Sequence, residues 1–350
     1  MDTPTIIAAF LAEGVRDRVF SGACAAWSVR GVTSDAACAG STAFEGGSPV
    51  TDDTLFDLAS LTKPFTASVI LRLVQAGRLD LDATLASFIP ELDQRPQGAA
   101  TLAELLAHEA GFQAYIPFFE QVAPAERGTA AGKDAVVRLT LEAAPAAPPG
   151  RASLYSDLGF IALGRILTSR FGPLDRLVRQ EVLTPLGLLR TGYGPLEGQV
   201  AATEACPWRG RTLAGEVHDD NAWVMGGVAP HAGLFSTSTD MVRFGAAWLD
   251  ALESGTWLGR DLAGRAVARR PMGRGLGWDL KGAEGSSAGT RLGTRTFGHL
   301  GFTGTSLWVD PDSGVSIALL TNRVHGGRAN ESIRAFRPAF HDRLMEALSL

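Results

Sequence analysis

The spacing of hydrophobic residues changes along the chain from that of strands to that of helices. Short apolar segments at 24–32 and 41–44 predict two antiparallel strands that form a hairpin near the N-terminus. Beyond Ser60 the spacing becomes helical, with five apolar side chains on one face: Phe65, Val69, Ile70, Leu73 and Val74. Pro64 suits the first turn of this helix, so we expect the helix to begin at residues 60–63.

The middle third has the periodicity of helices. Thr101 is placed to cap a helix that runs toward Gly111, and helical spacing recurs at 157–171 and 174–183. The segment 144–150 contains three prolines and ends on a glycine, so it is expected to be a loop.

The last third returns to strands after one more helix, which is expected at 239–252. Three strands are predicted: 275–280, 303–309 and 315–321. The turn residues at 310–314 join the last two strands as a hairpin, and a helix at 329–348 closes the chain.

Strands at both ends around a helical middle predict an α+β fold. The expected architecture is an antiparallel sheet flanked by N- and C-terminal helices, with an inserted, mostly helical lobe. Residues 1–78 and 240–350 would form the sheet domain, 79–239 the helical lobe, and a catalytic cleft would lie between them.

The composition narrows the classes of function. At 350 residues and 45% hydrophobic, the chain can bury a large core, which excludes intrinsic disorder. With 37 acidic and 32 basic residues, it has no general positive field, so nucleic acid is not an expected partner. No signal peptide and no apolar run long enough for a membrane span are recognisable, which favours a cytoplasmic protein without a membrane partner.

Neither a metal nor another cofactor is expected. Cys24, Cys38 and Cys206 are odd in number and far apart, which favours buried or free thiols over disulfides or a zinc cluster. None of the six histidines forms an i, i+4 pair around a glutamate, and His218 with the following two aspartates lacks a third spaced ligand.

Ser60-Leu61-Thr62-Lys63 is the first candidate for chemistry. Positions i and i+3 share a helix face, so the Lys63 amine can approach the Ser60 hydroxyl, as an activated nucleophile requires. The chain contains only three lysines beside 29 arginines, and an amine can lose its proton whereas a guanidinium cannot. The alternative is a helix-capping serine beside a solvated lysine.

Two further segments carry candidate residues. Tyr155 follows the proline-rich loop, and its phenol could act as a general base beside Lys63, although an ordinary interface tyrosine is an equal alternative. Asp157 could simply cap the following helix.

The third candidate segment, His299-Leu300-Gly301-Phe302, lies near the C-terminus. Its glycine permits close backbone approach, and its exposed N–H groups could form part of an oxyanion hole. A lone histidine such as His299 is more often structural.

Taken in this order, the three segments resemble the serine β-lactamase and penicillin-recognising enzyme superfamily, in particular its class C-like branch of esterases, DD-carboxypeptidases and D-aminopeptidases. The segment 105–111 looks like the segment that ends a helix in members of that family. Residues 217–237, here called the cleft wall, are similar to the wall region of its cytoplasmic-looking members. The resemblance extends from about residue 20 to the C-terminus.

The resemblance implies a role for each candidate residue. Ser60 would attack a carbonyl, Lys63 and Tyr155 would share the proton transfers, and His299 would stand where β-lactamases carry the lysine of Lys-Thr-Gly. The N–H groups of Ser60 and Phe302, the latter placed by Gly301, would hold the oxyanion.

Two departures from the family pattern bear on the substrate. Asp157 stands where penicillin-binding members usually carry asparagine, which replaces an amide donor with an acceptor or a charge. His299 is mostly neutral at pH 7, which weakens recognition of the carboxylate of penicillins and D-Ala peptides. Both departures favour less anionic substrates such as esters.

The sequence therefore predicts a serine hydrolase that forms an acyl-enzyme on Ser60 and acts on small esters or amides. β-Lactams or D-amino-acid peptides are alternative substrates, and a non-catalytic binding protein or sensor is the alternative class. The oligomeric state stays open. A Gly-x-Ser-x-Gly motif at 285–289 also occurs, but it lacks the preceding strand and following helix of a nucleophile elbow.

Overall fold

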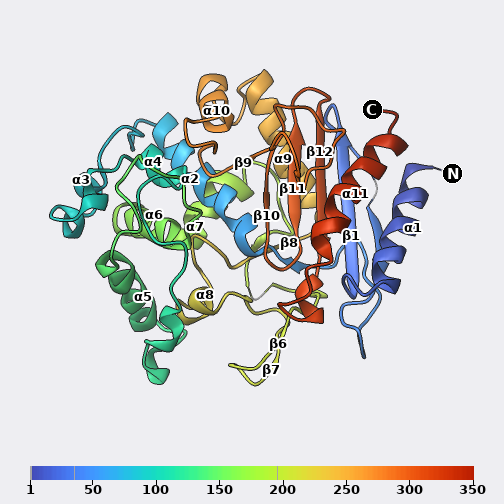
Figure 1. The fold of residues 1–350 in the computed structure, drawn as a ribbon, viewed down its shortest axis with the longest axis horizontal. Helices are drawn as coiled ribbons and strands as arrows, with labels where there is room; N and C mark the ends of the chain where they lie inside the picture. Colours follow the sequence, from blue (N-terminus) through green and yellow to red (C-terminus); the bar gives the residue numbers. More distant parts are fainter. Residues whose placement is uncertain (1, 35, 195) are drawn as a thin grey trace.

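An antiparallel sheet dominates one side of the molecule, and a group of helices occupies the other side (Figure 1). This computed structural model describes residues 2–34, 36–194 and 196–350. The seven strands follow the order β2-β1-β12-β11-β10-β9, and β3 also pairs with β1. Their bounds are Gly22–Val29 (β1), Val32–Thr33 (β2), Ala37–Gly40 (β3), Asp279–Leu280 (β9), Phe297–Leu300 (β10), Ser306–Asp310 (β11) and Val315–Thr321 (β12). The predicted α+β architecture is confirmed.

The two ends of the chain meet in the middle of this sheet. β1 pairs with β12 in a register that places Ala26 opposite Ala318. The predicted hairpin between β11 and β12 is confirmed, with Asp310 opposite Val315. The partner predicted for the first strand is wrong, because β1 turns at Arg30 and Gly31, both with positive φ, into β2 and then pairs with β3.

The cysteine prediction is wrong for two of the three residues. Cys24 of β1 and Cys38 of β3 are directly opposite each other, with 4.1 Å between their Cα atoms, and form a disulfide. Sequence spacing did not reveal this pair, because strand register brings the two residues together. Cys206 is free and buried, as predicted.

Helices cover both faces of the sheet and fill the rest of the molecule. Their bounds are Thr3–Arg16 (α1), Thr62–Gln75 (α2), Leu85–Phe88 (α3), Leu102–Leu106 (α4), Ala130–Glu142 (α5), Asp157–Phe171 (α6), Leu174–Val178 (α7), Asp220–Val224 (α8), Ser238–Glu253 (α9), Arg260–Val267 (α10) and Ile333–Ala347 (α11). The helices predicted at 157–171 and 239–252 are confirmed, the second to within one residue at each end. The helix predicted at 174–183 continues beyond α7 as a π-helical turn.

One predicted strand is mostly absent. Of the residues 275–280, only the last two belong to β9. Gly277 has a φ of +77°, and its N–H donates to the carbonyl of Leu106. A Cβ atom there would collide with Ala67 of α2. The chain therefore packs against α2 at Gly277 and enters the sheet only at Asp279.

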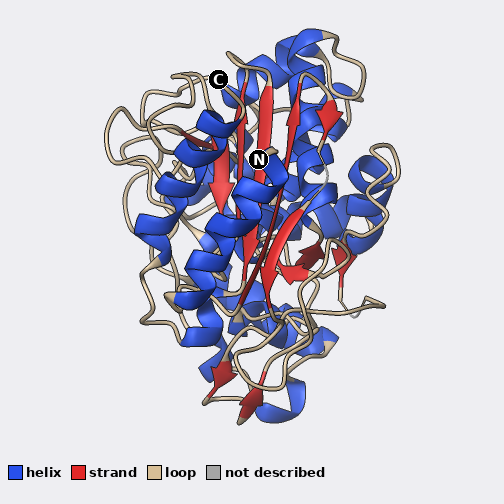
Figure 2. Ribbon diagram, turned by 90° about the vertical axis from the view of Figure 1, so that its right-hand side faces the viewer, coloured by secondary structure: helices blue, strands red, loops and turns tan. Residues whose placement is uncertain are grey.

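Two hydrophobic layers hold the helices to the sheet. The terminal helices α1 and α11 lie over one face (Figure 2), where they bury Ile7, Leu11, Trp27, Trp308, Phe340 and Leu344. The larger core lies on the other face and extends into the helical side. In it, Phe65 of α2 stacks on Phe244 of α9, with ring centroids 4.1 Å apart. This packing fixes α2, whose N-terminal end carries Ser60.

Two small sheets complete the fold. One has the order β4-β8-β5, with bounds Phe56–Asp57, Leu234–Ser236 and Gly192–Tyr193. The other is the hairpin of β6 (Ala205–Cys206) and β7 (Arg211–Thr212). Within the described ranges, no helix has the length and apolar character that crossing a bilayer requires. The division at residues 78/79 and 239/240 stays a prediction.

Candidate active site

Ser60 lies at a sharp corner between β4 and α2. Ala59, just before it, has a φ of +47°, a conformation that non-glycine residues rarely adopt. The N–H of Ala59 donates to Asp57 Oδ1 at 2.8 Å, which helps to stabilise the corner. Asp57 is buried, and this burial raises the pKa of its carboxyl group although the N–H groups of His218 and Ala59 oppose the shift.

Lys63 joins Ser60 to two other segments of the chain. Its Nζ atom donates to Ser60 Oγ at 2.9 Å and to the carbonyl of His231 at 3.3 Å. The same atom forms an ion pair with Asp157 Oδ1 at 2.7 Å. Burial alone lowers the pKa of Lys63, but Asp157 and Tyr155 raise it, and the net pKa lies above the ordinary lysine value. Lys63 is therefore an ammonium at neutral pH.

The side chain of Tyr155 is half-buried beside this pair, and its Oη atom is buried. Its ring centroid is 4.7 Å from Lys63 Nζ and 4.7 Å from the centroid of the His108 ring. Its Oη atom is close enough to Lys63 and Ser60 for both to lower the pKa, although it makes no hydrogen bond of good geometry. Burial outweighs both neighbours and raises the pKa of Tyr155, so the phenol is neutral at neutral pH.

Asp157 is not the cap of α6. Ser156 is the N-cap, because its Oγ atom accepts the N–H of Gly159 at 2.9 Å. The capping alternative for Asp157 is therefore wrong, since the cap lies one residue earlier. Asp157 becomes the first helical residue, and its carboxylate is free to pair with Lys63. The structure thus places the carboxylate of Asp157 beside the Lys63 ammonium.

His108 is a neighbour that the sequence did not single out as a site residue. Its Nδ1 atom accepts the N–H of Ser156 at 2.9 Å, and its ring packs against Tyr155. Burial holds the pKa of His108 well below its usual range, and the cations Arg274 and Lys63 lower it further. A neutral His108 thus fixes the segment that carries Tyr155 and Asp157.

His299 supplies no positive charge to the site. Its Nδ1 atom lies 2.8 Å from the carbonyl oxygen of Leu300, which accepts the hydrogen bond. Burial lowers the pKa of His299 to about 4, with Lys63 and Arg274 adding to the shift and Asp279 opposing it. The imidazole is neutral at pH 7, which agrees with the sequence-based expectation.

The turn after β10 touches the Ser60 corner. We call residues 301–305 the oxyanion loop, after the role that the family resemblance implies for the N–H of Phe302. A Cβ atom on Gly301 would collide with the carbonyl of Leu58 and with Thr305 Oγ1. Two threonines tie the loop to this segment: Thr303 Oγ1 donates to the Asp57 carbonyl at 2.7 Å, and Thr305 Oγ1 donates to the Leu58 carbonyl at 3.1 Å. The strand predicted at 303–309 therefore starts later, at Ser306.

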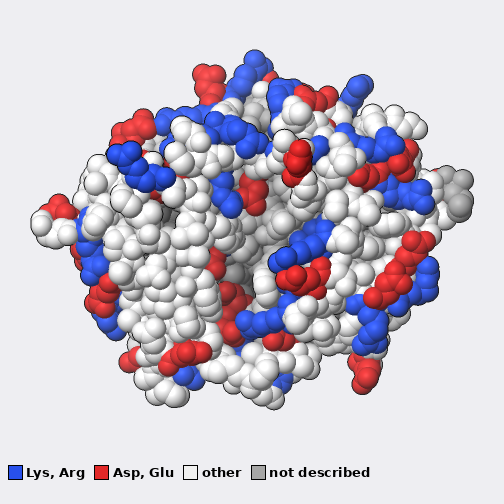
Figure 3. All heavy atoms as spheres, viewed as in Figure 1, with Lys and Arg blue, Asp and Glu red and all other residues white. Residues whose placement is uncertain are grey.

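Ser60 and Phe302 both line a cleft of about 550 Å³. Neither backbone N–H donates a hydrogen bond to another residue in the ranges that the structure describes. The cleft brings together six of the seven predicted site residues as lining groups: Ser60, Tyr155, Asp157, His299, Gly301 and Phe302. Lys63 lies beneath them and has no exposed surface. Figure 3 shows the hollow, with acidic and basic side chains around it.

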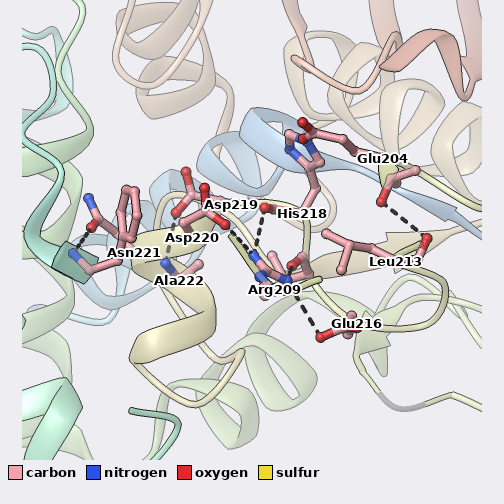
Figure 4. Close-up of polar contacts among 12 residues, drawn as sticks. Glu204, Arg209, Leu213, Glu216, His218, Asp219, Asp220, Asn221 and Ala222 are labelled. Carbon is pink, nitrogen blue, oxygen red and sulfur yellow. Dashed lines mark hydrogen bonds and ion pairs between the residues drawn. The ribbon is translucent and has the colours of Figure 1, made fainter. Parts of the chain in front are cut away.

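The cleft wall is held by a network of charges (Figure 4). The N–H of His218 donates to Asp57 Oδ2 at 2.6 Å, and its Nε2 atom lies 2.6 Å from Glu204 Oε2. Arg328 joins Glu204 to Asp220, at 2.8 and 3.0 Å. Nothing in the sequence marked Asp57, Glu204 or Arg328. His218 is 161 residues from Asp57, and Arg328 is 124 residues from Glu204, although Glu204 and His218 are only 14 residues apart.

Two other sequence features take no part in the cleft. The Gly-x-Ser-x-Gly motif at 285–289 lies in a loop, without the strand and helix that a nucleophile elbow needs. Across residues 2–34, 36–194 and 196–350, no three His, Cys, Asp or Glu side chains are grouped so that they could hold a metal ion.

Comparisons with known proteins identify the family of this chain. The family described as Beta-lactamase matches residues 7–338. A putative D-alanyl-D-alanine carboxypeptidase from Salmonella heidelberg (strain SL476) is 31% identical over 318 residues, which cover 81% of this chain and 72% of the relative. The chain therefore belongs to the Beta-lactamase family, and the predicted resemblance is confirmed.

Solved structures show the same fold at lower identity. The D-amino acid amidase from Ochrobactrum anthropi SV3, in complex with D-phenylalanine, has a TM-score of 0.75 at 23% identity and covers 100% of this chain and 99% of its own. EstCE1, described as a hydrolase with promiscuous acyltransferase activity, has a TM-score of 0.75 at 18% identity and covers 96% and 98%.

Substitution of Gly301 tests the close approach of the oxyanion loop to the Ser60 corner. Gly301→Ala should push the loop away from Leu58 and displace the N–H of Phe302, which should lower kcat/KM by about a hundredfold. Steady-state ester hydrolysis measures this loss. Gly264→Ala, on α10 where a Cβ meets no other atom within 4 Å, is the matched control. Equal activity of both variants would contradict the argument.

The neutral His299 predicts a pH dependence of stability. In the unfolded chain this imidazole takes up a proton near pH 6.5, whereas in the folded protein it does so only near its pKa of about 4. The free energy of unfolding should therefore decrease as the pH is lowered from 6.5 toward 4, by about 3 kcal/mol from His299 alone. Urea unfolding at several pH values should show that the stability advantage of the parent over His299→Gln shrinks from pH 7 to pH 4. A constant difference contradicts this prediction.

Proposed function

We propose that the protein is a serine hydrolase that forms an acyl-enzyme on Ser60 and acts on small esters or amides. The observation that carries this proposal is the contact of Lys63 Nζ with Ser60 Oγ at 2.9 Å and with Asp157 Oδ1 at 2.7 Å. A nucleophile beside a group that can relay its proton is the arrangement that covalent catalysis needs. The Beta-lactamase family match supports the reaction class.

Acylation starts with attack of Ser60 Oγ on the carbonyl carbon. The proton of Ser60 passes to Lys63 as Lys63 gives one of its own to Asp157, because the amine is already protonated in the free enzyme. The N–H groups of Ser60 and Phe302 stabilise the oxyanion. The family resemblance implied proton transfer by Lys63 and Tyr155, and the proposed relay adds Asp157 to these two residues.

The neutral Tyr155 suits the role of acid. Burial raises the pKa of this phenol, so it holds a proton that the leaving group can take. Asp157 then returns its proton to Lys63, and Lys63, whose ammonium lies over the Tyr155 ring, passes one on to Tyr155, so that all three groups regain their starting protonation states. Water then attacks the acyl-enzyme and releases the acid, with Ser60 restored.

The charges at the site support a substrate without a carboxylate at the His299 position. His299 is neutral, and the positive charge of Lys63 is paired with Asp157. Esters and amides are therefore favoured over β-lactams. The relationship to a putative D-alanyl-D-alanine carboxypeptidase supports D-amino-acid peptides as the second candidate.

Location in the cytoplasm, which the sequence favoured, stays a prediction. The disulfide between Cys24 and Cys38 favours an oxidising compartment over the cytoplasm, because disulfide bonds form and persist in oxidising compartments.

Labelling of Ser60 tests the proposal directly. Incubation with an aryl phosphonate should add one adduct, located on Ser60 by peptide mass spectrometry, and p-nitrophenyl esters should show a burst of product. Ser60→Ala should lose both the adduct and the burst. Lys63→Ala should lower kcat by roughly a thousandfold or more, and Lys63→Arg should lower it nearly as much, because a guanidinium cannot relay the proton. Saturable binding without turnover, unchanged in Ser60→Ala, would instead support a binding protein.

Substitution of Asp157 tests the proton relay. Asp157→Asn should lower kcat/KM at pH 7 by about a hundredfold, because the amide cannot accept the proton of Lys63. Asp310→Asn is the control, because it makes the same change at a buried carboxylate at the end of β11, away from the cleft. Retention of full activity by Asp157→Asn would exclude the relay.

A further inference from the structure

Two arginines behind the oxyanion loop are buried without a counter-charge. Arg323 and Arg337 are 7% and 6% exposed, and neither forms an ion pair with any carboxylate of the described ranges. Burial of an unpaired guanidinium costs free energy unless its N–H groups find strong acceptors. The acceptors of these two side chains therefore indicate what the charges do.

Arg337 of α11 binds the oxyanion loop through its carbonyl groups. Its Nη2 atom donates to the carbonyl of Gly301 at 3.1 Å and to that of Thr305 at 3.0 Å. The Gly301 carbonyl belongs to the same peptide group as the N–H of Phe302. Arg337 thus holds one end of a peptide group whose other end faces the cleft.

Arg323 holds the same loop at a different peptide group. Its Nε atom donates to the carbonyl of Phe302 at 2.9 Å, and its Nη1 atom donates to the carbonyls of Arg328 and Asn330. It therefore clamps the backbone one residue later and has no direct bond to the peptide group that carries the Phe302 N–H.

A cation at the oxygen of a peptide group strengthens its N–H as a donor. The charge draws electron density toward the carbonyl oxygen, and hydrogen bonds linked through one polar group reinforce each other in a low-dielectric interior. The two bonds of Nη2 also fix the plane of the peptide, so its N–H needs no reorientation when negative charge develops.

We propose that Arg337 is a positioning residue that orients and polarises the Gly301–Phe302 peptide group, so that its N–H binds the oxyanion of the tetrahedral intermediate more strongly. This inference rests on the proposed function, because it requires acyl transfer at Ser60.

Arg337 stays positively charged at neutral pH although burial and the nearby Arg323 both oppose the charge. Burial lowers the pKa of Arg337 to about 9, which leaves the guanidinium protonated at neutral pH. One helical turn later, His341 is fully buried, and burial together with Arg337 lowers the pKa of its imidazole to about 3. With His299 also neutral, Arg337 is the cation bonded directly to the peptide group of the Phe302 N–H.

A purely structural clamp is the alternative, and Arg323 is the matched control for it. Both arginines are less than a tenth exposed and donate only to backbone carbonyls, and Arg323 also lies over the Phe302 ring, 4.4 Å from its centroid. A structural role predicts that Arg337→Gln and Arg323→Gln lose activity in proportion to their loss of thermal stability. Polarisation predicts that Arg337→Gln loses more activity than its loss of thermal stability accounts for.

The test compares Arg337→Gln, Arg337→Lys and Arg323→Gln in ester hydrolysis, thermal unfolding and inhibition by an aryl boronic acid, which mimics the tetrahedral intermediate. Arg337→Gln should lower kcat by about tenfold or more with KM changed less than about threefold. Its boronic acid affinity should fall by the same factor as kcat/KM. Arg337→Lys, which keeps the charge and a donor, should recover part of both losses.

Three results would overturn the proposal. They are a wild-type kcat in Arg337→Gln, equal kcat losses at equal Tm in Arg337→Gln and Arg323→Gln, and boronic acid affinity unchanged while kcat falls. If Arg337→Gln does not fold, Arg337→Lys supplies the same comparison of kcat with boronic acid affinity. Phosphonate labelling of Ser60 separates the two proposals: without an adduct on Ser60 the proposed function fails, whereas labelled Ser60 with unaffected Arg337 variants removes only this inference.

Discussion

The charge of Lys63 is the constraint on which the site depends. Its side chain has no exposed surface, so the ammonium needs a carboxylate and further acceptors in the interior. Asp157 at the start of α6 provides the carboxylate, and the carbonyl of His231 in the cleft wall provides another acceptor. Ser60 is the third contact. One buried cation thus joins three segments of the chain around the hydroxyl that it serves.

A second set of contacts places the corner that presents Ser60. Asp57 fixes the unusual backbone of Ala59 on one side and the cleft wall at His218 on the other. The oxyanion loop touches the same segment through Thr303 and Thr305. The candidate nucleophile Ser60 and the candidate oxyanion donors therefore share one rigid unit, as an electrostatically prepared site requires.

The two departures from the family pattern have different consequences in three dimensions. Asp157 makes the environment of Lys63 more negative and keeps the amine protonated, whereas an asparagine would leave that charge unpaired. His299 removes a permanent cation from the edge of the cleft. Positive charge is instead supplied from below, by Arg337 and Arg323 behind the oxyanion loop. Both arginines also belong to the lining of the cleft.

Local sequence patterns were sufficient for the long helices α6 and α9, for the hairpin of β11 and β12, and for selecting Ser60, Lys63 and Tyr155 as candidate residues. The periodicity of α6 and the turn residues between β11 and β12 act over a few positions, so the sequence alone determined them. The pairing of Cys24 with Cys38 and the contact of Arg337 with Gly301 were decided only by the tertiary structure. Each depends on strand register or helix packing between separate segments, and no local propensity encodes which distant groups will meet.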